Sequence, residues 1–287
     1  MVERLKVAVE KARAMRKGVA NVAQPVAKAV EKAVKKTAPA EPQRTASADL
    51  AWSELESINF DDVHLERNRI ITRNKNDPAY IAFDVLRTRI MRAFKKNGWT
   101  RLGITSPTKG CGKTFISANL ALSMSRQQTN RTILMDMDLR LPALAKVLGV
   151  RHNDPARWFL SGEMEAEDFL RSVDRNLAIG LNSERVRDAA ELIQDPSTTE
   201  VLTEMNKTYE PDIVVYDLPP MLSCDDVIGF IPNIDCILLV TSGDRTRPDA
   251  ITECERLLQD QVPLLGVLLN KAELTDANKY GYEYGYS

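Results

Sequence analysis

The sequence has no long uninterrupted apolar run. Its longest apolar stretches, residues 237–240 and 264–269, are far below the roughly 18 residues that indicate a membrane span. Near the N-terminus, lysines and arginines interrupt the apolar positions, whereas a secretory signal needs an unbroken apolar stretch before its cleavage site. We therefore expect a cytoplasmic chain without a transmembrane helix.

Cysteine and histidine are scarce, with four and two residues. The cysteines are Cys111, Cys224, Cys236 and Cys254. They form no C-x-x-C pair, and none has a histidine at the spacing of a metal site. The pattern supports neither a disulfide framework nor a zinc site, so we predict reduced thiols.

Charge is unevenly distributed along the chain. Residues 1–48 contain 11 Lys and Arg against 4 Asp and Glu, a balance of +7, and the rest of the chain has a balance of −8. Apolar residues recur at helical spacing in this basic segment, although Pro25 interrupts it. The segment is either an amphipathic element that binds an anionic membrane or a partner, or a solvated, partly helical tail.

The composition indicates three parts. Hydrophobic residues at 44% and charged residues at 28% are ordinary for a soluble globular protein, which excludes a fibrous or globally disordered chain. We predict a basic segment and linker over residues 1–48, a globular domain over 49–272 and a tail over 273–287. Because the globular part is acidic, we expect no specific nucleic-acid binding.

Short β-rich runs alternate with helical stretches through the globular part. The runs are residues 102–105, 132–135, 177–181, 213–216, 236–241 and 264–269. Before them, Asp77 and a run of apolar residues at helical spacing predict a helix that ends at Gly98. The alternation predicts an α/β fold with a mainly parallel sheet and helices on both faces.

The strongest chemical signal is SPTKGCGKT, residues 106–114. It follows a predicted strand and opens an apolar helix, which is the context of a P-loop. Gly110 and Gly112 allow backbone N–H groups to turn toward an anion, Lys113 can reach the β- and γ-phosphates, and Thr114 can bind Mg²⁺. The full G-x-x-x-x-G-K-[ST] pattern would need a glycine where the chain has a proline, but the context still predicts nucleotide binding.

Three acidic residues end two further apolar strands. Asp136 and Asp138 close ILMDMD, and Asp217 closes DIVVYD. In an open parallel sheet, ligands bind at the carboxyl ends of the strands. We therefore expect these carboxylates to converge with the P-loop.

At these motifs the chain resembles the bacterial tyrosine kinases of capsule and exopolysaccharide synthesis, the BY-kinases. In that family SPTKGCGKT is similar to the Walker A motif, ILMDMDLRLP to Walker A′ and DIVVYDLPP to Walker B. The resemblance extends from about residue 77 to the last residue. It implies a P-loop fold and transfer of the γ-phosphoryl group of ATP to tyrosine, with Mg²⁺ as the metal.

The resemblance also implies roles for individual residues. Lys113, Asp136 and Asp138 would be catalytic, with Asp136 as the candidate to accept the tyrosine proton and Asp138 as the alternative. Thr114, Asp138 and Asp217 would hold Mg²⁺ or its waters. Nucleotide contacts would come from Thr108, Lys109, Gly110, Cys111, Gly112, Lys113, Thr114, Phe115 and Asn270. For Asn270, the alternatives are contact with the base or a turn or capping role, and for Arg140, support of the acidic pair or a surface ion pair.

The C-terminal residues YGYEYGYS place four of the seven tyrosines within the last eight residues. A packing role explains this composition poorly, because tyrosine alternates with glycine and glutamate. The tail is similar to the tyrosine cluster that the family autophosphorylates. The resemblance thus implies autophosphorylation of Tyr280, Tyr282, Tyr284 and Tyr286, with a sticky end or a docked edge segment as the alternative.

In the resembling family, stand-alone kinases depend on a membrane-embedded polysaccharide chain-length protein, whose cytoplasmic tail activates them. The resemblance implies such a partner and a peripheral place at the inner face of the membrane. Residues 1–36 would suit this place. The family also forms rings through an E-x-x-R-x-x-R motif, at whose positions this chain has Ile81, Asp84 and Arg87. We expect a homo-oligomer, in which Arg89 or Arg92 replaces the lost contacts or a different assembly forms.

Two alternatives share these motifs. One is an ATPase switch that positions partners, as at division sites or in plasmid partition. Such ATPases usually have a signature lysine five residues before the P-loop lysine, where this chain has Thr108 followed by Lys109. The other is an adaptor that binds nucleotide with little turnover. Phosphotyrosine on the purified protein distinguishes the kinase from both.

Overall fold

The computed structural model describes residues 44–70, 77–151 and 154–272. The strands are β1 (Arg101–Thr105), β2 (Thr132–Asp136), β3 (Leu170–Asp174), β4 (Leu177–Gly180), β5 (Ile213–Asp217), β6 (Cys236–Ser242) and β7 (Leu264–Asn270). The helices are α2 (Ala46–Glu54), α3 (Asp62–Arg67), α4 (Pro78–Asn97), α5 (Lys113–Ser125), α6 (Leu144–Leu148), α7 (Ala156–Leu160), α8 (Ala166–Phe169), α9 (Ala189–Gln194), α10 (Pro196–Tyr209), α11 (Asp226–Phe230) and α12 (Pro248–Leu258), with a 3₁₀ turn, η2 (Ile231–Asn233).

The strands form one sheet in the order β3-β4-β2-β5-β1-β6-β7. Every pairing is parallel except β3 with β4. The predicted α/β class and mainly parallel sheet are therefore confirmed, and each of the six predicted runs is a strand. The sequence analysis missed β3, which pairs antiparallel at the edge of the sheet.

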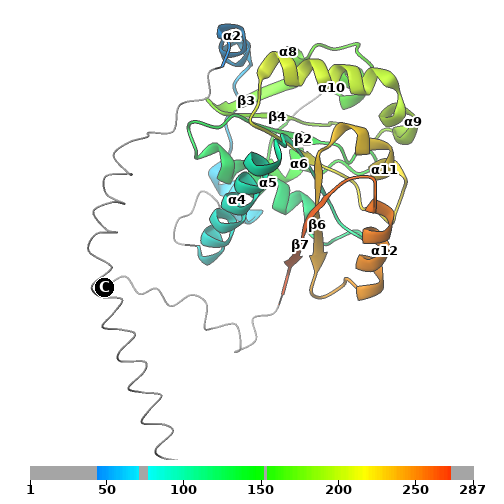
Figure 1. Cartoon of the computed structure of the whole chain (residues 1–287). Coiled ribbons are helices and arrows are strands. Elements are labelled where there is room, and N and C mark those ends of the chain that lie inside the picture. The colour runs from blue at the N-terminus through cyan, green and yellow to red at the C-terminus, as the bar shows by residue number, and fades with distance from the viewer. Residues whose placement is uncertain (1–43, 71–76, 152–153, 273–287) are drawn as a thin grey trace, which may run out of the picture. The chain divides into compact units, whose positions relative to one another are not determined.

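Helices cover both faces of the sheet (Figure 1). One apolar core lies between each face of the sheet and the helices that cover it. Alternate residues of the central strands enter opposite cores. Ile213 and Val215 of β5 pack with α4 and α5, whereas Val214 and Tyr216 pack on the side of α10 and α12. Burial on both faces explains why the central strands read as continuous apolar runs.

Helix α4 begins and ends where the sequence predicts. Asp77 is its N-cap and accepts a hydrogen bond from the Ala79 N–H at 2.8 Å. Gly98 ends it in the left-handed conformation, with φ 70°. Phe83, Ile90 and Phe94 are buried against the sheet, so the predicted apolar stripe is the face that packs.

Helix α2 begins inside the stretch predicted as a linker. Thr45 caps it, and the Arg44 guanidinium binds the Asp212 carboxylate and the Thr129 carbonyl. Trp52 is buried and donates from Nε1 to the Tyr209 carbonyl at 2.7 Å. These contacts fix α2 to the globular domain.

Two predicted segments fall largely or wholly outside the described ranges: the basic segment up to residue 43 and the tyrosine tail from residue 273. Among the helices that the structure does describe, none combines the length and apolar character needed to cross a bilayer.

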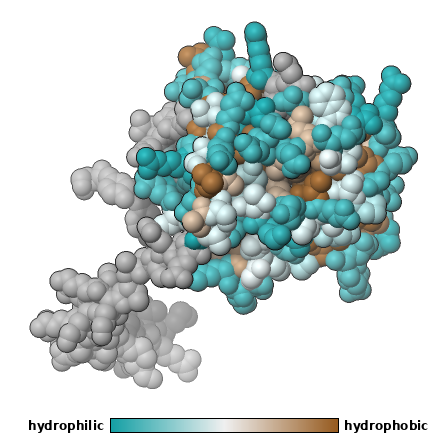
Figure 2. Space-filling model, turned by 90° about the horizontal axis from the view of Figure 1, so that it is seen from above, coloured by the Kyte–Doolittle hydropathy of each residue, from teal (hydrophilic) through white to brown (hydrophobic). Residues whose placement is uncertain are grey.

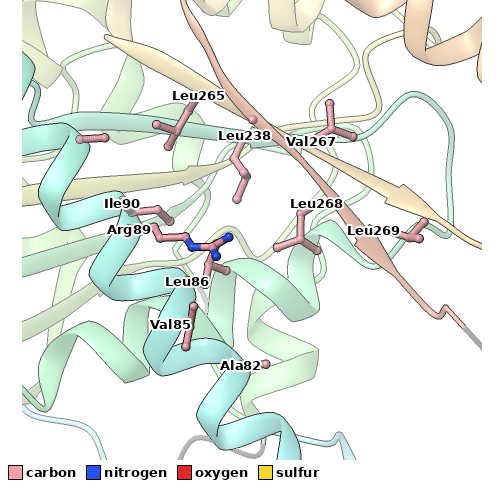
Figure 3. Close-up of a pocket in the computed structure, with 12 residues that line it drawn as sticks. Ala82, Val85, Leu86, Arg89, Ile90, Leu238, Leu265, Val267, Leu268 and Leu269 are labelled. Atoms are coloured by element: carbon pink, nitrogen blue, oxygen red, sulfur yellow. The ribbon is translucent and has the colours of Figure 1, made fainter. Parts of the chain in front are cut away.

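An apolar groove of about 550 Å³ lies between α4 and the edge strand β7 (Figure 3). Leu86 and Ile90 of α4 and Leu265 and Leu268 of β7 line it, and Arg89 extends into it. On the face seen in Figure 2, apolar residues form small patches among hydrophilic ones.

Candidate nucleotide and phosphoryl-transfer site

The P-loop joins β1 to α5 at the carboxyl edge of the sheet, as predicted from the motif. Gly110 and Gly112 have φ values of 83° and 93°, in a region of backbone conformation that residues with a side chain rarely adopt. A Cβ at Gly112 would also collide with Asn270 Nδ2. Both glycines are therefore required by the path of the loop.

The other predicted loop residues offer mainly their backbone. Cys111 is fully buried, and its Sγ lies 3.2 Å from the Thr108 carbonyl oxygen and 3.5 Å from Thr246 Oγ1. Phe115 packs edge-on against Phe83, with ring centroids 6.0 Å apart. Lys109 and Thr108 are exposed at the rim of the loop. An anion in the loop would thus meet N–H groups at the N-terminus of α5.

The carboxylates meet at the same edge because of strand register. Strand β5 lies between β2 and β1, and Asp217 is the direct partner of Asp136 across the β2–β5 ladder. Lys113 Nζ reaches this cluster from α5. It lies 2.9 Å from Asp138 Oδ2, 3.5 Å from Asp217 Oδ1 and 3.4 Å from Thr114 Oγ1.

Asp136 and Asp138 have different surroundings. Asp136 Oδ2 accepts hydrogen bonds from the N–H groups of Ala143 and Leu144 at 3.0 and 2.9 Å, and its Oδ1 accepts one from the Asp138 N–H at 3.3 Å. Asp138 Oδ1 accepts from the Leu141 N–H at 3.0 Å, and its Oδ2 faces Lys113. Asp136 therefore orders the loop after β2, while Asp138 points toward the P-loop lysine.

Burial and mutual repulsion shift the ionisation of the cluster. Burial, followed by the charge of Asp217, raises the pKa of Asp136 to about 7. Burial also raises the pKa of Asp217, which Lys113 opposes. Burial alone would lower the pKa of Lys113, but the Asp217 and Asp138 carboxylates raise it above its ordinary value. Lys113 thus holds its proton and balances two buried acids.

The residues fit a nucleotide with a magnesium ion. Asp217 Oδ2 is buried and has no hydrogen-bond partner among the described residues. Buried carboxylate oxygens are normally satisfied, so an unpaired one beside a P-loop suits an ion or its water. No group of three His, Cys, Asp or Glu side chains in the described ranges could hold a metal alone. Mg²⁺ is commonly bound by few protein ligands together with phosphate oxygens and water.

Arg140 has a partner that the sequence analysis did not identify. Its Nε and Nη2 each donate to the Asp226 carboxylate at 2.8 Å. Asp226 is fully buried, whereas 40% of the Arg140 side chain is exposed. Arg140 therefore supports Asp226 at the start of α11, and no bond from it to Asp136 or Asp138 is found.

Asn270 and its neighbour contact the P-loop from outside. Asn270 Nδ2 donates to the Cys111 carbonyl at 2.9 Å, and Lys271 Nζ donates to the Gly110 carbonyl at 2.8 Å. The sequence analysis selected Asn270 but missed Lys271. A lysine directly after the asparagine that ends the last apolar strand was the available signal.

Two of the three residues at the positions of the expected ring motif form ion pairs within the domain. Arg87 Nη1 lies 3.0 Å from Asp84 Oδ1 and donates to the Ser123 carbonyl at 2.8 Å. Asp84 also pairs with Arg126. Ile81 is 52% exposed. Arg87 and Asp84 are thus already paired inside the domain.

A lysine from a strand–loop–helix turn facing carboxylates at the carboxyl edge of a parallel sheet defines the P-loop nucleotide-binding class. Within this class, the chain belongs to the CobQ/CobB/MinD/ParA nucleotide binding domain family, which matches residues 102–283.

Curated relatives that the chain matches are named as tyrosine kinases. The chain is 27% identical over 245 residues to the putative tyrosine-protein kinase EpsB of Ralstonia nicotianae, covering 80% of this chain and 31% of that protein. It is 26% identical over 224 residues to the tyrosine-protein kinase YwqD of Bacillus subtilis, covering 77% of this chain and 92% of that protein. The expected resemblance to bacterial tyrosine kinases is confirmed.

The chain spans about a third of the length of the Ralstonia relatives, with 31% and 28% covered. Among solved structures, the kinase domain of Escherichia coli tyrosine kinase ETK matches with a TM-score of 0.66 and 24% identity, over 76% of this chain and 85% of that chain. That likeness shows a shared fold.

Proposed function

We propose that this chain is an ATP-dependent protein-tyrosine kinase that phosphorylates Tyr280, Tyr282, Tyr284 and Tyr286. The observation that carries the proposal is the position of Lys113 between Asp138 and Asp217 beside a P-loop. Similarity over most of its length to a relative named a tyrosine-protein kinase supports it. The tyrosine-rich C-terminus supplies the acceptors.

The described residues divide the work of nucleotide binding. Backbone N–H groups of residues 110–114 and the Lys113 ammonium would bind the phosphates, and Asn270 would lie near the base. Thr114, Asp138 and Asp217 would hold Mg²⁺ directly or through water. The ion would supply positive charge to the transferring phosphoryl group. Phosphoryl transfer depends mainly on positioning and charge neutralisation, which these groups provide.

The acceptor tyrosine must lose its proton during attack, since its ordinary pKa is about 10. Asp138 is better placed than Asp136 to accept this proton. Both oxygens of Asp136 accept backbone N–H groups, and the side chain is 1% exposed. Asp138 faces Lys113, and the γ-phosphate would lie beside this lysine. This geometry supports Asp138 as the proton acceptor, although burial brings the pKa of Asp136 to about 7.

Phosphorylation of the tail would change its affinity for the site. Each phosphate adds a charge of about −1.5 to −2, and the site already contains three buried acids. A phosphorylated tail would be repelled from the acidic cluster of a neighbouring copy. We therefore propose transfer within a homo-oligomer followed by release of the product tail.

We further propose a place at the inner face of the cell membrane, beside a membrane-embedded polysaccharide chain-length protein that activates the kinase. The balance of +7 in residues 1–48 supports membrane proximity, since anionic lipid attracts such segments. Co-sedimentation with anionic vesicles tests this point. A chain starting at residue 44 retains the Arg44 contact with Asp212 and should lose the binding. Equal binding by both chains would refute it.

The kinase proposal is tested by the fate of the γ-phosphate. The purified chain is incubated with Mg²⁺ and ATP labelled at the γ-position, with and without the partner's cytoplasmic tail. A kinase retains the label on protein tyrosine. Release of the label as free phosphate without phosphotyrosine would identify a nucleotide-dependent switch, and binding with neither product would identify an adaptor.

A further inference from the structure

Two consecutive residues at the end of β7 clamp the P-loop. Lys271 Nζ donates to the Gly110 carbonyl at 2.8 Å, and Asn270 Nδ2 donates to the Cys111 carbonyl at 2.9 Å. The two acceptors are consecutive peptide carbonyls of the loop. The clamp is anchored further by the Gly243 N–H, which donates to the Asn270 carbonyl at 2.9 Å.

The clamp determines where the loop N–H groups point. In a trans peptide the C=O and the following N–H point in opposite directions. Holding the Gly110 carbonyl toward Lys271 therefore turns the Cys111 N–H away from Lys271, toward the inside of the loop. The bond from Asn270 does the same for the Gly112 N–H. These N–H groups are among the P-loop backbone donors that are predicted to bind phosphate.

The backbone of Lys271 is itself unusual. Its φ is 52°, in the left-handed region that non-glycine residues rarely occupy. The Lys271 N–H donates to Asn270 Oδ1 at 2.9 Å, so one asparagine fixes both the turn and the loop. Such conformations persist where surrounding contacts enforce them, often at functional sites. This turn sets the position from which the Lys271 side chain reaches Gly110.

We propose that Lys271 is a positioning residue of the nucleotide site, which orients the Cys111 N–H toward phosphate by holding the Gly110 carbonyl. Lys271 acts through the loop and makes no phosphate contact. The inference rests on the proposed nucleotide binding but needs no tyrosine transfer. It explains why a charged side chain from the sheet edge lies against a loop that already contains Lys113.

The experiment compares Lys271→Met, which keeps length and removes the donor, with Lys271→Arg, which keeps donor and charge. Arg247→Ala is the matched control, because Arg247 is an 81% exposed cation of the β6–α12 loop that forms an ion pair with Asp249. Affinity for ADP and for a non-hydrolysable ATP analogue is measured by calorimetry with Mg²⁺, at low and high salt. Hydrogen exchange of residues 108–114 and the melting temperature are measured on the same proteins.

We expect Lys271→Met to lower the affinity for both nucleotides about fivefold to tenfold, because the variant loses about one hydrogen bond. Exchange of the loop amides should rise without nucleotide, the melting temperature should stay within about 2 °C of wild type, and Lys271→Arg should restore affinity. Arg247→Ala should leave affinity and loop exchange unchanged.

Wild-type affinity in Lys271→Met would overturn the proposal, as would weakened affinity with unchanged hydrogen exchange of the loop. A loss of affinity that disappears at high salt would also overturn it, because salt screens a purely long-range charge effect. If Lys271→Met shows the expected changes while no tail phosphotyrosine forms, the positioning role stands and the kinase proposal fails.

Discussion

The Lys113 ammonium lies 2.9 Å from Asp138 Oδ2, and both side chains are at most 10% exposed. In this arrangement the P-loop lysine neutralises carboxylates of its own domain. A nucleotide phosphate that attracts Lys113 would leave Asp138 and Asp217 without their cation. An ion of two positive charges can replace it, so nucleotide and metal binding should be linked through this lysine.

The linkage predicts that nucleotide affinity depends strongly on Mg²⁺. We expect ADP and an ATP analogue to bind at least about fivefold more weakly when EDTA removes the metal, because coupling of about 1–3 kcal/mol is typical of linked sites. Asp217→Asn should reduce this dependence. Calorimetric titrations with Mg²⁺ and with EDTA measure it. Equal affinities under both conditions would exclude the linkage.

Removal of the lysine should destabilise the fold in a pH-dependent way. Lys113→Met leaves Asp138 and Asp217 buried without a cation, a change that costs about 3–5 kcal/mol in buried pairs. Burial already raises the pKa of Asp217, and loss of Lys113 raises it further, so the deficit should be largest near pH 8 and shrink as the pH falls and Asp217 takes up a proton. Urea unfolding at several pH values measures it.

The control is Lys207→Met, which removes a 77% exposed partner of Glu204 and should change stability by less than about 1 kcal/mol. A deficit in Lys113→Met that is absent, or independent of pH, would show that the two carboxylates are not balanced by this lysine.

Asp136 should make stability fall as the pH rises. Its pKa is raised from 3.8 to about 7, first by burial and then by Asp217, so the folded protein holds a proton that the unfolded chain releases. Its stabilising contribution is complete below about pH 4 and is lost as the pH rises to about 7. Relative to Asp136→Asn, wild type should lose stability on the order of 3 kcal/mol over this range. A constant difference between the two proteins would contradict the shift.

Gly112→Ala should impair nucleotide binding. The residue has a φ of 93°, and an added Cβ would collide with Asn270, so both the loop and its clamp must shift. We expect affinity for the ATP analogue to fall by at least about tenfold. The matched control is Gly266→Ala in β7, where a Cβ meets no atom within 4 Å and binding should be unchanged. Equal affinity of both variants with wild type would contradict the assigned loop geometry.

The sequence predicted the central part of the fold because apolar runs bounded by polar residues identify buried parallel strands. It also predicted that Asp136, Asp138 and Asp217 would meet near Lys113, because carboxyl ends of parallel strands share one edge. Strand β3 was not predicted because LRSVD is a mixed, partly exposed edge segment rather than an apolar run.

Contacts between distant segments were not predictable. The pairing of Arg140 with Asp226 joins residues 86 positions apart, and the bond from Lys271 to Gly110 joins residues 161 positions apart. Sequence pattern places Arg140 shortly after β2 and Lys271 directly after β7. The choice of partner depends on loop conformations, such as the left-handed turn at Lys271, that no periodicity encodes.

The most direct test of the kinase is phosphotyrosine mapping by mass spectrometry after incubation with ATP and Mg²⁺, alone and with the partner's cytoplasmic tail. Wild type should gain phosphate on Tyr280, Tyr282, Tyr284 and Tyr286. Lys113→Met and a variant with all four tyrosines changed to phenylalanine should gain none there. An unmodified wild-type tail under both conditions, in protein that still binds ATP, would contradict the account.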